Sequence, residues 1–218
     1  MTSRRILGLL TGVLVVVTAT GCVSSPTPSA RDSAPPTATA DPTATATPTA
    51  TPEPTETATE PTPLTVPACD DLLPLEALRV TSSAAALESF GPVDDERLDR
   101  VMGPLATATL ADAASSVTCD WGISGSDGSF SVTVAQIAET AGDELIAALR
   151  GAPDYDAAEP QGLTAFVRAF PEGLPTHLGY AFDGPVWVTV YGTAVSDVTS
   201  VEIAAQAAHA VTAANADG

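Results

Sequence analysis

Two neighbouring stretches in the second half of the chain alternate apolar residues with small or polar ones, the period-two pattern of a half-buried β-strand. The first runs from Val117 to Ser124, and the alternation resumes at Phe130 and continues to Gln136. Between them, Gly125-Ser-Asp-Gly128 is a turn signal. This pattern predicts a β-hairpin. Three further strands are predicted at 163–170, 179–183 and 186–191.

Helical spacing of apolar residues appears at both ends of this region and inside it. An amphipathic helix is predicted over 140–150, with its apolar side chains turned inward at Leu145, Ile146, Ala148 and Leu149. Further helices are expected over 70–80, 106–115 and 200–214, and a helical turn or loop over 94–102. We therefore expect an α+β fold, in which an antiparallel sheet of about five strands packs helices on one face.

The chain begins with the pattern of an export signal. Arg4 and Arg5 precede an apolar run over 6–17, which is shorter than the ~20 residues of a membrane-spanning helix. Small residues and then Cys22 follow. The pattern predicts a cleaved signal peptide over 1–21, and the sequence leaves the export route, general or twin-arginine, open.

Residues Ala19-Thr20-Gly21-Cys22 resemble the lipobox of bacterial lipoproteins, with Ala19 where that family usually has leucine. The resemblance implies that Cys22 carries a diacylglyceryl group and that the protein is anchored on the extracytoplasmic face of the cell membrane. Two acyl chains give stable anchoring. The alternative is an ordinary secretory signal followed by an unrelated cysteine.

Residues 22–66 are nearly all threonine, alanine, proline and serine. Such a segment has no apolar face to bury, so we expect a disordered tether. Its prolines favour an extended, semi-rigid spacer, and its composition is also that of O-glycosylated stalks. The remaining residues, 67–218, are expected to form a single globular domain.

Charge narrows the range of partners. The whole chain has 27 acidic and 8 basic residues, and from Pro67 onward 22 acidic residues face five arginines, a formal charge of −17. There is no lysine. Strong negative charge repels phosphate backbones, so nucleic acid is not an expected partner. A solvated surface accounts for most of this charge, and binding of a cation or of a basic partner is the alternative.

Two cysteines remain in the domain, Cys69 and Cys119. An isolated pair in an oxidising compartment favours one disulfide, here closing a loop of about 50 residues. A redox-active pair is more often Cys-x-x-Cys. A metal site would need His177 and His209 as further ligands, at poor spacing.

The layout as a whole resembles a group of actinobacterial lipoproteins of unknown function. The residues that carry the resemblance are Cys69-Asp-Asp-Leu-Leu-Pro at a helix start and Cys119-Asp-Trp121 on a strand. More distantly, the domain is similar to the extracellular sensor domains of actinobacterial serine/threonine kinases. The resemblance implies a Cys69–Cys119 bridge and a domain that binds something, without catalysis.

No catalytic motif is present. The sequence has no nucleophile elbow, phosphate loop, dinucleotide fingerprint or His-Glu-x-x-His. Two acidic groups, at 94–99 and 154–156, lack the spacing of a calcium loop. We therefore expect no catalytic residues, no metal site and no cofactor.

Two residues are the candidate ligand contacts. Trp187 follows Gly184-Pro185 at a strand start, where an aromatic face can stack on a ligand, and core packing is the alternative. His177 is placed in an exposed loop between two strands, with a ligand or pH-sensing role as the alternative to plain surface polarity.

These observations predict a non-enzymatic binding or interaction domain, with a cell-wall component or an envelope protein as partner. An accessory or regulatory subunit of an envelope transporter or kinase is the alternative, and a cell-wall hydrolase is the less favoured one.

Overall fold

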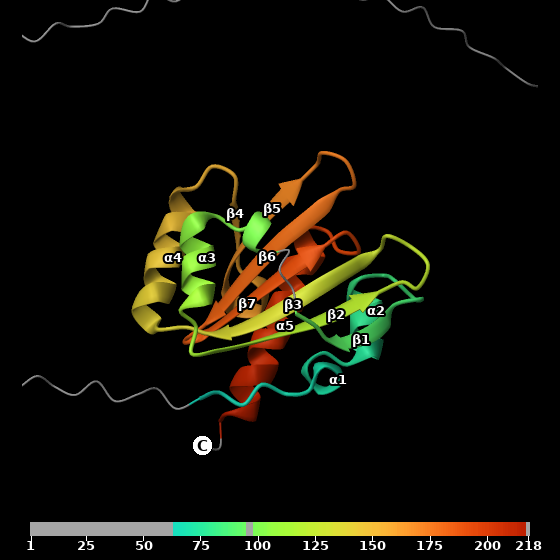
Figure 1. Ribbon diagram of the computed structural model, residues 1–218, viewed down its shortest axis with the longest axis horizontal. Coiled ribbons are helices and arrows are strands. Elements are labelled where there is room, and N and C mark those ends of the chain that lie inside the picture. Colours follow the sequence, from blue (N-terminus) through green and yellow to red (C-terminus); the bar gives the residue numbers. More distant parts are fainter. Residues whose placement is uncertain (1–62, 95–97, 217–218) are drawn as a thin grey trace, which may run out of the picture. The chain divides into compact units, whose positions relative to one another are not determined.

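Seven antiparallel strands form one sheet in the order β1-β2-β3-β7-β6-β5-β4 (Figure 1). The structure, a computed structural model, describes residues 63–94 and 98–216. The strands are β1 (Glu88–Pro92), β2 (Ser115–Gly122), β3 (Ser129–Gln136), β4 (Asp156–Ala158), β5 (Thr164–Phe170), β6 (Thr176–Asp183) and β7 (Val186–Gly192). The predicted fold class, α+β with an antiparallel sheet, is confirmed.

The predicted hairpin is the β2–β3 pair, in which Val117 lies opposite Val134 and Trp121 opposite Phe130. The three strands predicted after it are β5, β6 and β7. β6 pairs antiparallel with β5 on one side and with β7 on the other. β3 pairs with β7, which joins the two halves of the sheet across its centre.

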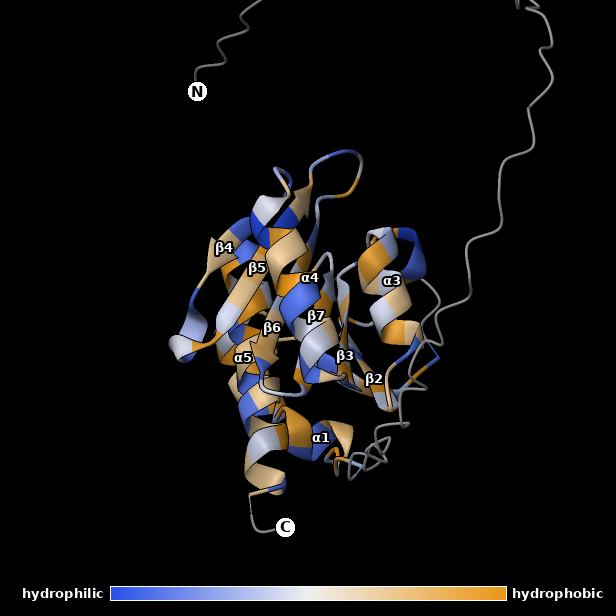
Figure 2. Cartoon of the chain, turned by 90° about the vertical axis from the view of Figure 1, so that its left-hand side faces the viewer, coloured by the Kyte–Doolittle hydropathy of each residue, from blue (hydrophilic) through white to orange (hydrophobic). Residues whose placement is uncertain are grey.

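The predicted number of about five strands is wrong, because the two edge strands have no apolar alternation. β1 is five residues long and contains a register shift between Ser89 and Gly91, and β4 has only three residues. Figure 2 shows β4 at the outer edge of the sheet. Edge strands are paired on one side only and are often short or irregular, so their sequences carry little signal.

Helices cover both faces of the sheet, so the expectation of helices on one face is also wrong. One face, here called face A, packs on α1 (Cys69–Leu72), α2 (Leu75–Thr81) and α5 (Asp197–Ala214). The other, face B, packs on the 3₁₀ helix η1 (Leu98–Arg100), α3 (Pro104–Ala111) and α4 (Glu139–Gly151). Figure 1 shows α3 and α4 side by side, away from α5.

The strands supply apolar residues to both faces. In β7, Val186, Val188 and Val190 pack into the face A core, whereas Trp187 between them belongs to the face B core. A strand buried on both faces reads as a continuous apolar run, without the alternation of a one-sided sheet. The run Val-Trp-Val-Thr-Val in β7 carries that signal.

Several helix boundaries also differ from the prediction. The helix expected over 70–80 is two helices, because Pro74, the N-cap residue before α2, lacks the N–H that a continuous helix would need. α5 begins three residues earlier than predicted. There the Ser196 side chain accepts from the Thr199 N–H and the Thr199 hydroxyl accepts from the Ser196 N–H, a capping box.

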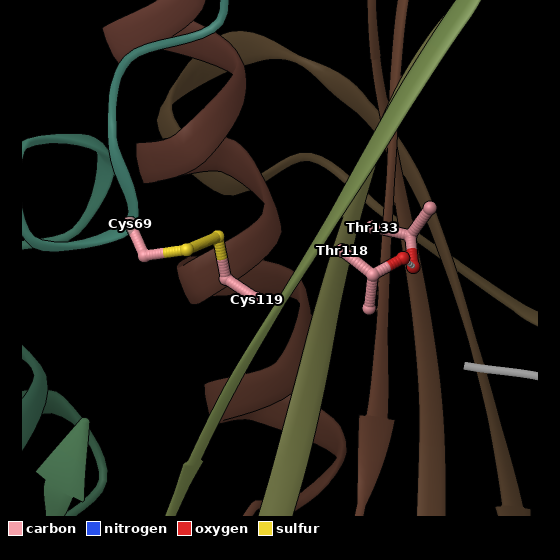
Figure 3. The surroundings of a disulfide bond; sticks show 4 residues. All are labelled: Cys69, Thr118, Cys119 and Thr133. Atoms are coloured by element: carbon pink, nitrogen blue, oxygen red, sulfur yellow. Dashed lines mark hydrogen bonds between the residues drawn. A yellow bond between two sulfur atoms is a disulfide. The ribbon is translucent and has the colours of Figure 1, made fainter. Parts of the chain in front are cut away.

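The predicted Cys69–Cys119 disulfide is present, with 5.7 Å between the two Cα atoms. It joins α1 to β2 on face A, while Thr118 and Thr133 point to the other side of the sheet (Figure 3). The Thr118 and Thr133 hydroxyl oxygens lie 2.8 Å apart. Both cysteines are buried in the face A core, where Trp121 stacks on Phe130.

The segment that leads into α1 is held against the domain, and we call residues 63–68 the strap. The Thr65 N–H donates to Asn215 Oδ1 and Asn215 Nδ2 donates to the Thr65 carbonyl, both at 2.9 Å. The Leu64 N–H donates to Gln136 Oε1 at 2.9 Å. Leu64 and Val66 pack on the face A core.

Candidate functional site

A hollow of about 310 Å³ lies between the first turns of α5 and the β4 edge of the sheet. We call it the α5 hollow. On its helix wall, Asp197, Val198, Val201 and Glu202 are spaced so that they form one stripe of α5. The opposite wall comes from the end of β4, the start of the 3₁₀ helix η2 (Pro160–Gly162) and β5. Its residues there are Ala158, Glu159, Pro160 and Val167.

The floor of the α5 hollow is apolar and its rim is acidic. Val167 and Val201 are 7% and 4% exposed, whereas Val198 on the lip is 68% exposed. The three polar lining residues, Glu159, Asp197 and Glu202, are all carboxylates. No arginine of the described residues lines the hollow. The site therefore combines an apolar surface with negative charge on two opposite walls.

His177 adjoins this rim, because its Nδ1 lies 2.7 Å from Asp197 Oδ1. It lies within β6, so its predicted place in a loop is wrong. Its strand register places it on face A, beneath the start of α5. Among the other rim groups, Gln161 Nε2 donates to Glu202 Oε2 at 3.4 Å. Glu159 makes no ion pair with any residue that the structure describes.

Trp187 and His177 do not meet, because they lie on opposite faces of the sheet. Trp187 is fully buried on face B, where it stacks on Phe182 at 6.2 Å and meets Tyr180 edge-on at 5.5 Å. Its ring is part of the core and is not presented to a ligand at the surface. The ligand role of either residue stays a prediction.

Tyr180 lies at the centre of this aromatic cluster, stacked on Tyr155 at 5.8 Å. Burial, followed by the neighbouring Tyr155 phenol, raises the pKa of Tyr180 well above its usual range. Among the described residues, neither the buried Tyr180 hydroxyl nor the buried Trp187 Nε1 has a hydrogen-bond partner within 3.5 Å. The neutral phenol is therefore the form that the core accepts.

A second candidate runs along α4 on face B. Four of its residues, Glu139, Asp143, Ile146 and Arg150, form one helical stripe, and this stripe lines two hollows of about 360 and 350 Å³ that share Thr164. Their floor includes Phe166 and Phe182, which are 1% and 6% exposed. The α5 hollow differs in having a strongly exposed apolar residue, Val198, on its lip and only carboxylates among its polar lining residues, whereas the α4 hollows include Arg150.

The two acidic groups considered for calcium do not form sites in the described part of the chain. Asp95 and Glu96 lie outside the described residues, and Asp154 Oδ2 lies 3.3 Å from Arg168 Nη2. Across residues 63–94 and 98–216, no three histidine, cysteine or acidic side chains are arranged to hold a metal ion. Within those same ranges, no helix is long and apolar enough to cross a membrane.

Sequence reasoning found only the neighbour of the α5 hollow, His177, and missed its lining. Glu159 follows β4, whose sequence has no apolar alternation. Val198 precedes the predicted start of the last helix at residue 200, and Glu202 lies in its first turn. One signal was present: the helical spacing of Asp197, Val198, Val201 and Glu202 exposes an acidic and apolar stripe next to the capping residue Ser196.

Comparison with known proteins identifies no relative. No family model, no curated protein and no solved structure matches this chain.

Proposed function

We propose that this protein is a membrane-anchored extracytoplasmic lipoprotein whose domain binds a ligand or an envelope partner and does not catalyse a reaction. The lipidated residue is Cys22, and residues 22–62 hold the domain away from the membrane, since residues 63–66 of the expected tether belong to the strap. Residues 22–62 lie outside the described residues, so this part of the proposal depends on the sequence.

The disulfide supports the extracytoplasmic location. Disulfides persist in oxidising compartments and are rare in the reducing cytosol. Cys69 and Cys119 are both buried and bonded, directly after the segment that we interpret as a tether. A buried structural bridge is what an exported domain of this size commonly has.

The observation that carries the binding role is the α5 hollow. It is an accessible concavity that combines an apolar floor with a few polar groups, which is the usual make-up of a binding site. Its polar groups are carboxylates on separate walls, and the only histidine beside them is already paired with Asp197. This arrangement favours recognition of a ligand.

The anchor is tested with the variant Cys22→Ala in the native host. We expect the wild-type chain in the membrane fraction, released only by detergent, and the variant in the soluble extracytoplasmic fraction, because the acyl chains are its only anchor in this proposal. The double variant Cys69→Ser/Cys119→Ser is the control and should stay with the membrane. Detergent-dependent retention of Cys22→Ala would rule out lipidation at this residue.

The binding role is tested by thermal unfolding of the oxidised chain against Ca²⁺ and a panel of wall fragments, glycans and lipids. A ligand that binds only the folded state raises the melting temperature in a saturable way. Such a shift would support small-ligand binding. Turnover of any of these compounds that one side-chain substitution abolishes would contradict the proposal.

A further inference from the structure

The β4 edge and the α5 hollow lie together, and we consider them as one surface. Within the described part of the chain β4 pairs only with β5, so no described strand lies along its other edge, and Figure 2 shows no labelled element beyond it. Asp156 and Ala157 are exposed, and Ala158 at the end of β4 lines the hollow. An extended peptide that pairs with an open edge strand gains main-chain hydrogen bonds, and pockets beside the edge select its side chains.

Charge selects the kind of side chain. Glu159 lies on one wall of the hollow and Asp197 and Glu202 on the other, and Asp156 adds a further carboxylate on the strand itself. Arg150 and Glu159 both line the neighbouring hollow next to α4. The domain as a whole has a formal charge of −17, which attracts cationic partners over long range.

The apolar floor of the α5 hollow favours a lysine side chain over a metal ion or an arginine. A bare metal ion needs several oxygen ligands converging on one point, whereas no three acidic, histidine or cysteine side chains of the described residues are arranged in that way, and the hollow is also lined by valine, alanine and proline. A lysine side chain fits both features: its four-carbon stem covers apolar surface, and its ammonium is a compact charge with three rotatable donors. An arginine fork suits a single bidentate carboxylate better than three separate ones.

We propose that the α5 hollow holds a lysine side chain of an extended peptide segment that pairs with the outer edge of β4. This rests on the proposed function of the domain as a binding module, and it names the partner's chemistry. Because the chain has no lysine, the segment belongs to another kind of molecule and not to a second copy of this protein.

The test measures binding of a fluorescein-labelled, terminally blocked five-residue peptide to the oxidised full-length chain in detergent. The peptide has a central lysine between valines. Two control peptides replace the lysine by norleucine or by glutamate, and a third keeps it but has methylated backbone nitrogens. Fluorescence polarisation should rise in a saturable way with the lysine peptide and markedly less with each control.

The variant Glu159→Gln/Glu202→Gln tests the rim while leaving the Asp197–His177 pair in place. We expect binding of the lysine peptide to weaken roughly fivefold or more, the size expected for two partly exposed ion pairs. The matched control is Glu144→Gln/Glu172→Gln, which removes the same charge from exposed positions elsewhere and should bind as the wild type does. Equal melting temperatures of the two variants show that both are folded.

Three results would refute the lysine site in the hollow: equal binding of the norleucine peptide, equal weakening by both double variants, or no saturable binding of the lysine peptide. Each leaves the broader proposal separately testable, because a melting shift with another ligand would still support a binding domain. If the methylated peptide binds as well as the unmodified one, pairing with β4 is refuted.

Discussion

At the scale of single residues, Tyr180 shows how burial fixes an ionisation state. Its phenol lies in the aromatic cluster of face B with no partner within 3.5 Å among the described residues, and burial, followed by the Tyr155 phenol, raises its pKa above the ordinary value of about 10. The folded chain therefore keeps this proton at a pH where the unfolded chain loses it. Unfolding then releases a proton, so the free energy of unfolding falls as the pH rises above about 10.

We predict that Tyr180→Phe reduces this loss of stability in alkali. Between pH 10 and 11 the wild type should lose up to about 1.4 kcal/mol more than the variant, while at pH 7 the two should differ little, because the hydroxyl has no partner to lose. Urea unfolding at each pH measures this. Tyr191→Phe, at a half-buried position, is the control and should retain the wild-type pH dependence.

Gly179 is a residue where no side chain fits. A Cβ atom there would lie 2.9 Å from the Ser200 carbonyl carbon, because α5 crosses β6 at this point. We predict that Gly179→Ala lowers the free energy of unfolding by about 1–3 kcal/mol through overpacking. Gly151→Ala, at the end of α4, meets no atom within 4 Å and should be nearly neutral. Equal stability of the two variants would mean that α5 packs less closely than described.

The burial of Tyr180 and of Trp187 cannot be predicted from the sequence. The pattern placed Tyr180 and Trp187 on strands, which is confirmed, but it did not show that both faces of those strands are covered. The position of Trp187 near a strand start is compatible with an exposed ring that stacks on a ligand. In the structure, however, α4 packs over this face and the ring is buried. A residue's exposure depends on which elements cross its strand, and that is set by contacts distant in sequence.

At the scale of elements, regular patterns predicted best. The β2–β3 hairpin and the α4 helix were predicted within a few residues, because each buries one consistent stripe or face. β1 and β4 were missed because they are short, largely exposed edge strands, and each pairs with only one neighbouring strand of the described sheet. Pro74 was a signal for the break between α1 and α2. It was overlooked because Leu72, Leu75 and Leu78 have the spacing of one continuous helix.

The strap over 63–68 makes two of its hydrogen bonds to one side chain, Asn215. Asn215 both donates to and accepts from the Thr65 backbone, as a neighbouring strand would. We predict that Asn215→Ala costs about 1 kcal/mol of stability and speeds hydrogen exchange at the Thr65 amide, with little change in the β3 amides. Asn215→Asp is a useful comparison, since it keeps the acceptor but loses the donor. Unchanged exchange at Thr65 in Asn215→Ala would contradict this account of the strap.

At the scale of the whole molecule, the disulfide connects the start of α1 to β2. Cys69 and Cys119 are 50 residues apart in sequence, and the loop they close contains α2, β1 and α3. In the chain-entropy account, a loop of this length contributes up to about 4 kcal/mol by restricting the unfolded chain.

We predict that Cys69→Ser lowers the free energy of unfolding by a few kcal/mol, measured by urea unfolding without reductant. Reduction of the wild type should reproduce the effect, and the variant should be insensitive to reductant. An unchanged transition in the variant would mean that no bridge forms in solution.

The α5 hollow belongs to this largest scale, and this explains why sequence reasoning located only its edge. Its walls come from residues 158–167 and 197–202, which are brought together when α5 packs over β5 and β6. A motif search compares residues at fixed spacing along the chain. A site assembled from two segments that are about 40 residues apart has no such spacing to detect.

If the domain is attached through its amino end, as we propose, the position of the disulfide has a mechanical consequence. A pull on the chain at residue 63 would first peel the strap, whose hold on the domain consists of a few hydrogen bonds and two apolar side chains. At Cys69 the load would pass through a covalent bond into β2, an interior strand of the sheet. Force would therefore bypass α2, β1 and α3, which would stay unstretched inside the closed loop. The bridge would act as a stop that limits peeling to the six residues before it.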